Sequence, residues 1–226
     1  MNILALDSAD KVLSVALQAN SDIWYTEIDA GTRHSELMME CIDDLFKKTG
    51  ISQKELNLAA CMQGPGSFTG LRIGFSTVKG LALALGIPFS AIPTLDCLAY
   101  PFSSWPGIVV PAIDAKKNCF FTAFYRDGKK LTEYMDESPQ TIARELEKVR
   151  LSGTEPVIVT GYGANLLCPL LSGFFPSDYI SLDPIFGRGK ARELLEIIKR
   201  DIIRVNTGMD IGPEYLRKSD AEIKLK

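Results

Sequence analysis

Hydrophobic positions along the chain form short apolar runs and longer stripes with helical spacing. Runs at 3–7, 12–19 and 23–30 are separated by polar turns, which predicts three strands. From 35 to 49, apolar residues recur at three- and four-residue steps and Gly50 follows, so a helix is expected there. The next predicted elements are a strand, a helix, a strand and a helix at 58–63, 69–85, 89–92 and 94–100.

The pattern starts again after 102–107, a segment with two serines and a proline that favours a boundary. Strands and helices are predicted at 108–114, 119–125, 131–135, 139–149, 157–160, 164–171 and 190–205. The first strand of each half ends on an aspartate, Asp7 and then Asp114. Although a repeated pattern of this kind also arises by chance, it favours an α/β protein with duplicated strand-strand-strand-helix units. The expected domains are 1–104 and 105–212, with a tail at 213–226 and the helix 190–205 able to pack back on the first lobe.

The most distinctive stretch lies at 64–86 and reads GPGSFTGLRIGFSTVKGLALALG. It opens with a tight Gly-Pro-Gly turn, after which Ser67 or Thr69 can cap the helix, and Gly86 ends it. A glycine-rich turn before a helix can cradle phosphate. Neither the P-loop ending nor the Gly-x-Gly-x-x-Gly fingerprint is present, however.

Within this helix, small residues form a stripe beside the apolar face. The stripe consists of Gly70, Gly74 and Thr77. Because each helical glycine costs roughly 1 kcal/mol relative to alanine, another element is expected to approach this side closely. That element is either the protein's own sheet or a helix of a partner.

Composition narrows the class of protein. The chain has 226 residues, of which 46% are hydrophobic and 23% charged, as is typical of a globular protein. A net charge of −3 and a pI of about 5.3 argue against a broad nucleic-acid-binding face. The five cysteines show no Cys-x-x-Cys spacing, and neither a leader nor a membrane-spanning run is evident, so a cytoplasmic protein with reduced thiols is expected.

Candidate catalytic and metal-binding residues are few. His34 is the only histidine, and it stands at the start of a helix, where capping or packing is the common role. Ser67 lies in no Gly-x-Ser-x-Gly elbow. Neither a metal site nor nucleophilic catalysis is therefore expected.

Several segments resemble the bacterial TsaB family, also called YeaZ. GPGSFTGLRIG, followed after the helix by IPFSAIPTLDCLA, is the most specific of them. NILALDSADKVLSVAL, TRHSEL, VVPAIDAKKNCFFTAFY and PEYLR are similar too. The resemblance covers most of the chain and is weakest over 129–155.

This resemblance implies the two-lobed actin/Hsp70/sugar-kinase (ASKHA) fold. It also implies a non-catalytic scaffold subunit of the bacterial tRNA threonylcarbamoyladenosine (t6A) synthase, with no cofactor. The chain would pair with TsaD, which transfers the threonylcarbamoyl group to the adenosine next to the anticodon. The pair would recruit the ATPase TsaE, tRNA would be met only through the complex, and the chain alone would form a homodimer. A His-x-x-x-His metal pair of TsaD falls here on Thr94 and Leu98, and neither is a competent ligand.

In the ASKHA fold, carboxylates at strand ends and glycine-rich turns hold Mg-nucleotide. The matching places here are Asp7, Ser8, Asp114, Gly161 and Gly163. The turn after Asp7 lacks glycine, and no acidic residue precedes the last glycine of 161–163, so a vestigial site is expected. The alternative functions are a small sugar-kinase-like ATPase, which nucleotide affinity would reveal, and a glycoprotease-related metallopeptidase, which metal content would reveal.

The family resemblance also implies that helices 35–49 and 69–85 form the partner interface. The expected interface residues are Leu37, Met38, Cys41, Leu45, Gly70, Gly74 and Thr77. The alternative is that both helices simply cover their own sheet. The helix 69–85 favours a partner because it is apolar or small on two sides.

Overall fold

The computed structural model describes residues 1–200 and 210–217 and divides the chain into two units. Unit 1 comprises residues 1–97 and a second stretch that begins at Gly189 and ends at Glu214, whereas unit 2 comprises 98–188 and resumes at Tyr215. Each unit has its own sheet and its own hydrophobic core. The boundary lies at 97/98 rather than at 104/105, and unit 1 is interrupted by the whole of 98–188.

Unit 1 is built on a five-stranded sheet with the order β3-β2-β1-β4-β5. The strands are β1 (Ile3–Asp7), β2 (Val12–Ala19), β3 (Asp22–Asp29), β4 (Leu58–Gly64) and β5 (Phe89–Pro93). The first three pair antiparallel as a meander, and β4 and β5 then add in parallel on the other side of β1. The central strand β1 is buried along its whole length.

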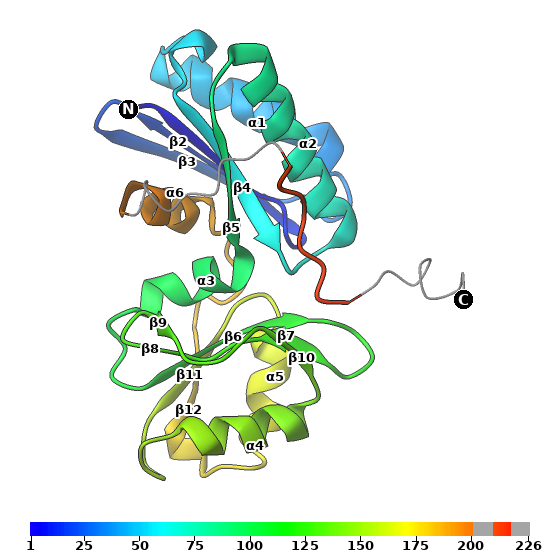
Figure 1. The fold of residues 1–226 in the computed structure, drawn as a ribbon, viewed down its shortest axis with the longest axis vertical. Coiled ribbons are helices and arrows are strands. Elements are labelled where there is room, and N and C mark those ends of the chain that lie inside the picture. The colour runs from blue at the N-terminus through cyan, green and yellow to red at the C-terminus, as the bar shows by residue number, and fades with distance from the viewer. Residues whose placement is uncertain (201–209, 218–226) are drawn as a thin grey trace. The chain divides into compact units, whose positions relative to one another are not determined.

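Helices cover both faces of this sheet (Figure 1). One face carries α1 (His34–Thr49) and α2 (Phe68–Leu85), and the other carries α6 (Ala191–Arg200). The short α3 (Thr94–Ala99) follows β5. As predicted, Ser67 caps α2 by accepting a 3.2 Å hydrogen bond from the Gly70 N–H, and left-handed Gly86 ends it.

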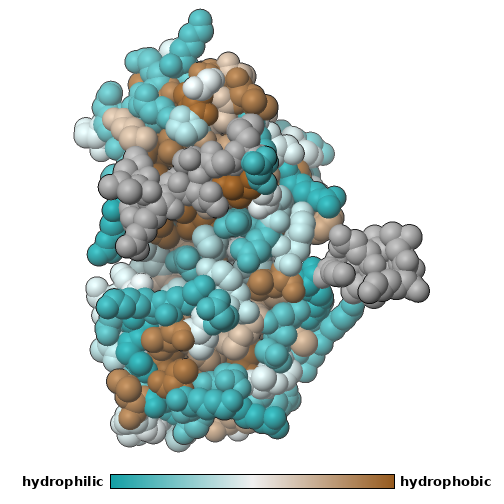
Figure 2. Space-filling view, viewed as in Figure 1, coloured by the Kyte–Doolittle hydropathy of each residue, from teal (hydrophilic) through white to brown (hydrophobic). Residues whose placement is uncertain are grey.

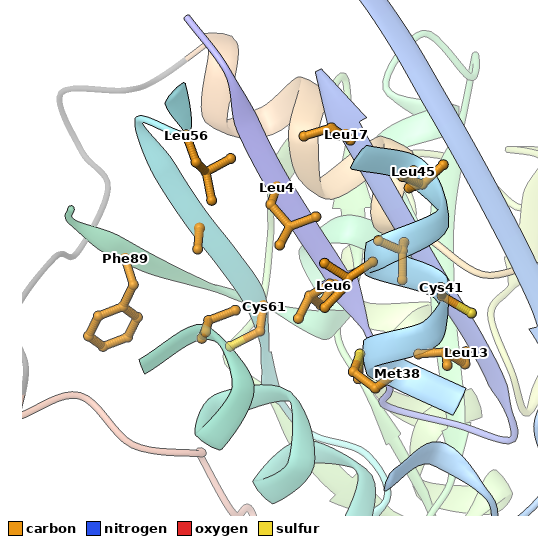
Figure 3. Packing of buried hydrophobic residues seen from close by; sticks show 14 of the residues in the cluster. Leu4, Leu6, Leu13, Leu17, Met38, Cys41, Leu45, Leu56, Cys61 and Phe89 are labelled. Carbon is orange, nitrogen blue, oxygen red and sulfur yellow. The ribbon is translucent and has the colours of Figure 1, made fainter. Parts of the chain in front are cut away.

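The core of unit 1 lies between the sheet and the α1–α2 layer. Side chains from β1 and β2, including Leu4, Leu6 and Leu13, meet Met38 and Leu45 of α1 (Figure 3). Because side chains alternate along a strand, Ile3, Ala5 and Asp7 point to the opposite face, where α6 packs. The sheet is thus apolar toward α1 and partly polar toward the start of α6.

Unit 2 repeats the topology of unit 1. Its seven strands are β6 (Ile108–Asp114), β7 (Phe120–Thr122), β8 (Tyr125–Arg126), β9 (Lys129–Lys130), β10 (Met135–Glu137), β11 (Val157–Thr160) and β12 (Ile180–Leu182), and its helices are α4 (Pro139–Val149) and α5 (Ala164–Leu171). The order β10-β7-β6-β11-β12 and the strand directions match those of unit 1. The predicted α/β fold with duplicated units is confirmed.

Some predicted elements differ in their limits. The strand expected at 119–125 is two strands, because β7 pairs with one end of β6 and β8 with the other. Of the helix expected at 190–205, residues 201–205 lie outside the described part, as does 218–226 of the tail. Among the described residues, no helix is both long enough and apolar enough to cross a membrane.

Candidate functional site

The aspartate at the end of β1 was a nucleotide-site candidate, and the structure buries it completely. Asp7 is 0% exposed. Its Oδ1 accepts a 3.0 Å hydrogen bond from the Ala9 N–H, and its Oδ2 accepts a 2.7 Å hydrogen bond from the Lys190 N–H. Both carboxylate oxygens therefore accept hydrogen bonds from main-chain N–H groups of unit 1, and one of these groups lies at the start of α6.

The neighbouring strands hold the same end of α6. Ser14 Oγ on β2 accepts a 3.1 Å hydrogen bond from the Ala191 N–H, and Glu27 Oε2 on β3 accepts a 3.2 Å bond from the Gly189 N–H. The Tyr25 hydroxyl lies 2.7 Å from the same Glu27 oxygen and 3.0 Å from the Gly189 carbonyl oxygen. Burial, together with the Glu27 carboxylate, raises the pKa of Tyr25. Three consecutive N–H groups, which a helix leaves unpaired at its start, are thereby satisfied.

Ser8, the second candidate in unit 1, is also engaged internally. Its Oγ donates a 2.8 Å hydrogen bond to the Gly70 carbonyl oxygen of α2. A Cβ atom at Gly74 would lie 2.7 Å from Ser8 Oγ, and one at Gly70 would strike the Ser8 carbonyl oxygen. Gly70 and Gly74 therefore let α2 approach the end of its own β1, which corrects their placement on a partner-facing stripe.

The remaining nucleotide-site candidates lie together in unit 2, at the ends of β6 and β11. Burial opposes ionisation of Asp114, but hydrogen bonds from the Lys116 ammonium and N–H, at 2.7 and 2.8 Å, outweigh it and lower the pKa of Asp114. The Gly163 N–H donates to the Ala112 carbonyl oxygen at 2.8 Å. Cβ atoms at Gly161 or Gly163 would lie within 3 Å of the β6 backbone. These glycines thus permit close packing against β6.

Metal ligands are not clustered in the described part of the chain. Residues 1–200 and 210–217 contain no group of three or more His, Cys, Asp or Glu side chains that could hold a metal ion. His34 is buried at the start of α1, and Thr94 and Leu98 are fully buried. Burial also raises the pKa of Cys61 and Cys97, which makes these thiols poor ligands and poor nucleophiles.

The interface residues expected on α1 are mostly inside unit 1. Met38, Cys41 and Leu45 are only 1–5% exposed and belong to the core with β1 and β2 (Figure 3). Leu37 and, on α2, Thr77 are half-buried. Cys41 and Leu45 have little area to offer a partner, so an interface on these helices would rest mainly on other positions, although Met38 and Thr77 also border the surface between α1 and α2.

An open groove between α1 and α2 supplies such positions. It has a volume of about 490 Å³, and its lining is mostly apolar. The residues that line it are Ser35, Met38, Met39, Phe68, Thr69, Arg72, Ile73, Ser76 and Thr77. Met39 is 47% exposed, and the Arg72 guanidinium lies 3.8 Å from the centre of the Phe68 ring.

Most of these lining residues were missed because the predicted interface followed the strongest hydrophobic stripe of each helix. That stripe is the one a helix buries in its own core. The useful signal was a second, weaker set of positions, such as Met39 and Ile73, on the helix sides away from the sheet.

The matching family model and the curated relatives are both named for the threonylcarbamoyl modification of tRNA. The sequence model of the family described as "TsaD: tRNA N6-adenosine threonylcarbamoyltransferase" matches residues 28–160. The chain is 30% identical to the tRNA threonylcarbamoyladenosine biosynthesis protein TsaB of Escherichia coli over 73% of each chain. It is 25% identical to that of Bacillus subtilis over 99% of this chain and 97% of the relative. The solved structure of YeaZ from Pseudomonas aeruginosa, 23% identical, superposes with a TM-score of 0.78 over 95% of this chain and 99% of that one, and shows the same fold.

Proposed function

The chain belongs to the TsaB family and so takes part in tRNA threonylcarbamoyladenosine biosynthesis, in which we propose that it is a non-catalytic scaffold subunit that pairs with TsaD. The observation that supports a non-catalytic role is that the Asp7 carboxylate accepts hydrogen bonds from two main-chain N–H groups of unit 1. In this arrangement the carboxylate supports the fold, and its complete burial keeps it away from a substrate or a metal-bound nucleotide.

The groove between α1 and α2 is the proposed contact surface for TsaD. Its lining combines the apolar side chains of Met39, Phe68 and Ile73 with polar side chains that include Arg72. This combination is typical of protein interfaces, in which an apolar centre excludes water and a charged or polar rim fixes the orientation. The family model spans both helices, so a TsaD subunit would carry a related helix pair.

The remaining parts of the proposal follow from the same pairing. The two subunits together would recruit TsaE, and tRNA would be bound by the complex, since this chain has a net charge of −3. In the absence of TsaD, the groove would be covered by a second copy of the chain. The complex would act in the cytoplasm.

The proposal is tested by the association of the purified chain with TsaD from the same organism, measured by sedimentation velocity and calorimetry. Met39→Asp places a carboxylate in the groove and should weaken binding at least tenfold, because an unpaired charge would be buried. Leu151→Asp is the matched control, since Leu151 is 79% exposed and lies in unit 2. Equal affinities for wild type, Met39→Asp and Leu151→Asp would reject the groove as the contact surface.

A sugar-kinase-like ATPase is the alternative that the fold leaves open, since related folds turn over nucleotide. The hydrogen bonds of Asp7 and Ser8 argue against it. Met38 is one of the expected interface residues, but Met38→Asp would be an unsuitable test of the groove because Met38 is buried in the core, where a charge would unfold unit 1.

A further inference from the structure

Residues 213–217 were expected to be part of a tail, but the structure anchors the segment 211–217 at both ends. Its first part belongs to unit 1, which ends at Glu214, and its last part belongs to unit 2, which resumes at Tyr215. The chain therefore passes from unit 1 to unit 2, back to unit 1 and once more to unit 2. We call 211–217, which is red in Figure 1, the C-terminal strap.

The unit 1 end of the strap is held by β4 and by the hydrophobic core. The Glu214 N–H donates a 2.8 Å hydrogen bond to the Gln63 carbonyl oxygen near the end of β4. A Cβ atom at Gly64 would strike the Glu214 carbonyl oxygen, so the backbone of the strap lies directly against this strand end. Ile211 packs on the core of unit 1. Much of the face seen in Figure 2 is hydrophilic, so an apolar contact of this kind fixes the strap at one place.

The unit 2 end of the strap is held by the guanidinium of Arg217. It donates two hydrogen bonds of 2.6 Å to the carboxylate of Asp136 on β10 and one of 2.7 Å to the carbonyl oxygen of Ala115, which follows β6. It also lies 5.9 Å from the centre of the Phe121 ring on β7. Because β7 lies between β10 and β6, this one side chain spans three strands. Bidentate, charge-assisted pairs of this type are among the stronger polar contacts.

Only Tyr215 and Leu216 separate the two anchors. The extended chain from Glu214 to Arg217 spans at most about 10 Å, so the strap has little slack. The other two places where the chain passes from one unit to the other are 97/98 and 188/189. Domains of one chain ordinarily move relative to each other unless something restricts them. A short third connection with an anchor in each unit is a restriction of that kind.

We propose that the C-terminal strap restricts the relative motion of the two units, and that the Arg217–Asp136 pair is its releasable end. The two side chains of this pair are 25% and 19% exposed, so water can solvate their charges when the pair opens, and neither sheet has to unfold. With the pair open, residues after Glu214 form an ordinary chain end, and the units are joined only at 97/98 and 188/189. The strap acts in the chain by itself and needs no partner protein.

Residual dipolar couplings of the isotope-labelled chain test the proposal, because they report the alignment of each unit separately. In wild type, the couplings of both units should fit one alignment tensor. Arg217→Ala frees the unit 2 end and should abolish this common tensor, and Asp136→Asn, which removes the charge but keeps the shape, should do the same. Ile211→Ser weakens the unit 1 end and should have the same effect. Arg144→Ala, at an exposed position of α4, is the matched control and should keep the common tensor.

Variants at opposite ends separate a strap from a contact that stabilises unit 2 alone. Loss of the common tensor in Arg217→Ala and in Ile211→Ser, with the amide chemical shifts of both sheets unchanged, would support the strap. Separate tensors already in wild type, or a common tensor in all the variants, would overturn it. If Arg217→Ala alters the shifts of β6, β7 and β10 while Ile211→Ser keeps the common tensor, the pair serves only unit 2 and the proposal is rejected.

Discussion

The Lys190 N–H donates a 2.7 Å hydrogen bond to Asp7 Oδ2, although the two residues are 183 positions apart in the sequence. Asp7 ends the central strand of unit 1, and Lys190 immediately precedes α6. From the sequence, the place of Asp7 at a strand end made it a candidate residue for binding Mg-nucleotide. In the structure, it anchors the start of the last described helix.

Replacing Asp7 should therefore cost stability. Asp7→Ala leaves the N–H groups of Ala9 and Lys190 without their acceptor in a buried place, so the free energy of unfolding should fall by about 2 kcal/mol. Asp7→Asn keeps one acceptor oxygen and should lose less. Urea denaturation measures both, with exposed Asp44→Ala as a control that should stay within about 0.5 kcal/mol of wild type. A wild-type unfolding curve for Asp7→Ala would contradict the anchoring role.

Nucleotide binding should be weak for the same reason. Asp7 and Ser8 in unit 1 already hydrogen bond to main-chain groups, and in unit 2 the Gly163 N–H donates to Ala112. Calorimetry with Mg-ATP should give a dissociation constant no lower than roughly 1 mM, which corresponds to a binding free energy of about −4 kcal/mol. Micromolar binding that Asp7→Ala abolishes would favour the ATPase alternative over the scaffold.

Two glycines of α2 should respond oppositely to alanine in the isolated chain. Gly74→Ala places a methyl group 2.7 Å from Ser8 Oγ, so overpacking should cost about 1–3 kcal/mol. Gly80→Ala meets open space and should stabilise by up to about 1 kcal/mol. Thermal and urea unfolding at low protein concentration compare the two. If both substitutions lowered the free energy of unfolding by similar amounts, the difference in local space between Gly74 and Gly80 would not determine the effect of a methyl group.

The carboxyl of Glu193 in α6 should give the chain a recognisable pH dependence. Burial raises the pKa of Glu193 above its ordinary value of 4.5, and Asp7 adds to this, whereas Lys190 opposes it. Just above pH 4.5, the Glu193 carboxyl therefore binds more protons in the folded chain than in the unfolded chain. Protonation of Glu193 then increases the free energy of unfolding as the pH falls toward 4.5. The non-titrating variant Glu193→Gln lacks this contribution.

Urea denaturation of wild type and Glu193→Gln between pH 7.5 and 5 measures this contribution. The difference in unfolding free energy should shift in favour of wild type as the pH falls. A difference that is independent of pH would show that the Glu193 carboxyl titrates alike in the folded and unfolded chains.

Local sequence patterns predicted most of the secondary structure. Helix α4 begins and ends where its spacing and the following residues indicate, and the ends of α1 and α2 at Gly50 and Gly86 are marked by glycines that adopt the left-handed conformation. Such signals act within one or two turns, so a single sequence contains them. The duplicated topology was visible because Asp7 and Asp114 end equivalent strands in both units.

The site was harder to predict because it depends on contacts between distant segments. Nothing near Gly70 or Gly74 indicates that Ser8 lies against them, and the spacing alone fits a partner equally well. Met38 and Cys41 form a regular apolar stripe whether their cover is the protein's own sheet or another subunit. Unit 1 includes a second stretch because α6 packs on β1, β2 and β4, with the Asp7–Lys190 hydrogen bond at the start of the helix. The helix expected at 190–205 was allowed to pack back on the first lobe, but no local pattern indicates these particular contacts.

The interruption of unit 1 by residues 98–188 has a consequence for synthesis on the ribosome. Strands β1 to β5 emerge first, yet α6, which covers one face of their sheet, is made only after residues 98–188. At 5–20 residues per second, that delay is on the order of ten seconds. During this time Asp7, Ser14 and Glu27 lack their hydrogen bonds to the start of α6. The nascent chain then exposes one face of the sheet. Translation speed through unit 2 therefore sets how long unit 1 stays open to chaperones and to misfolding.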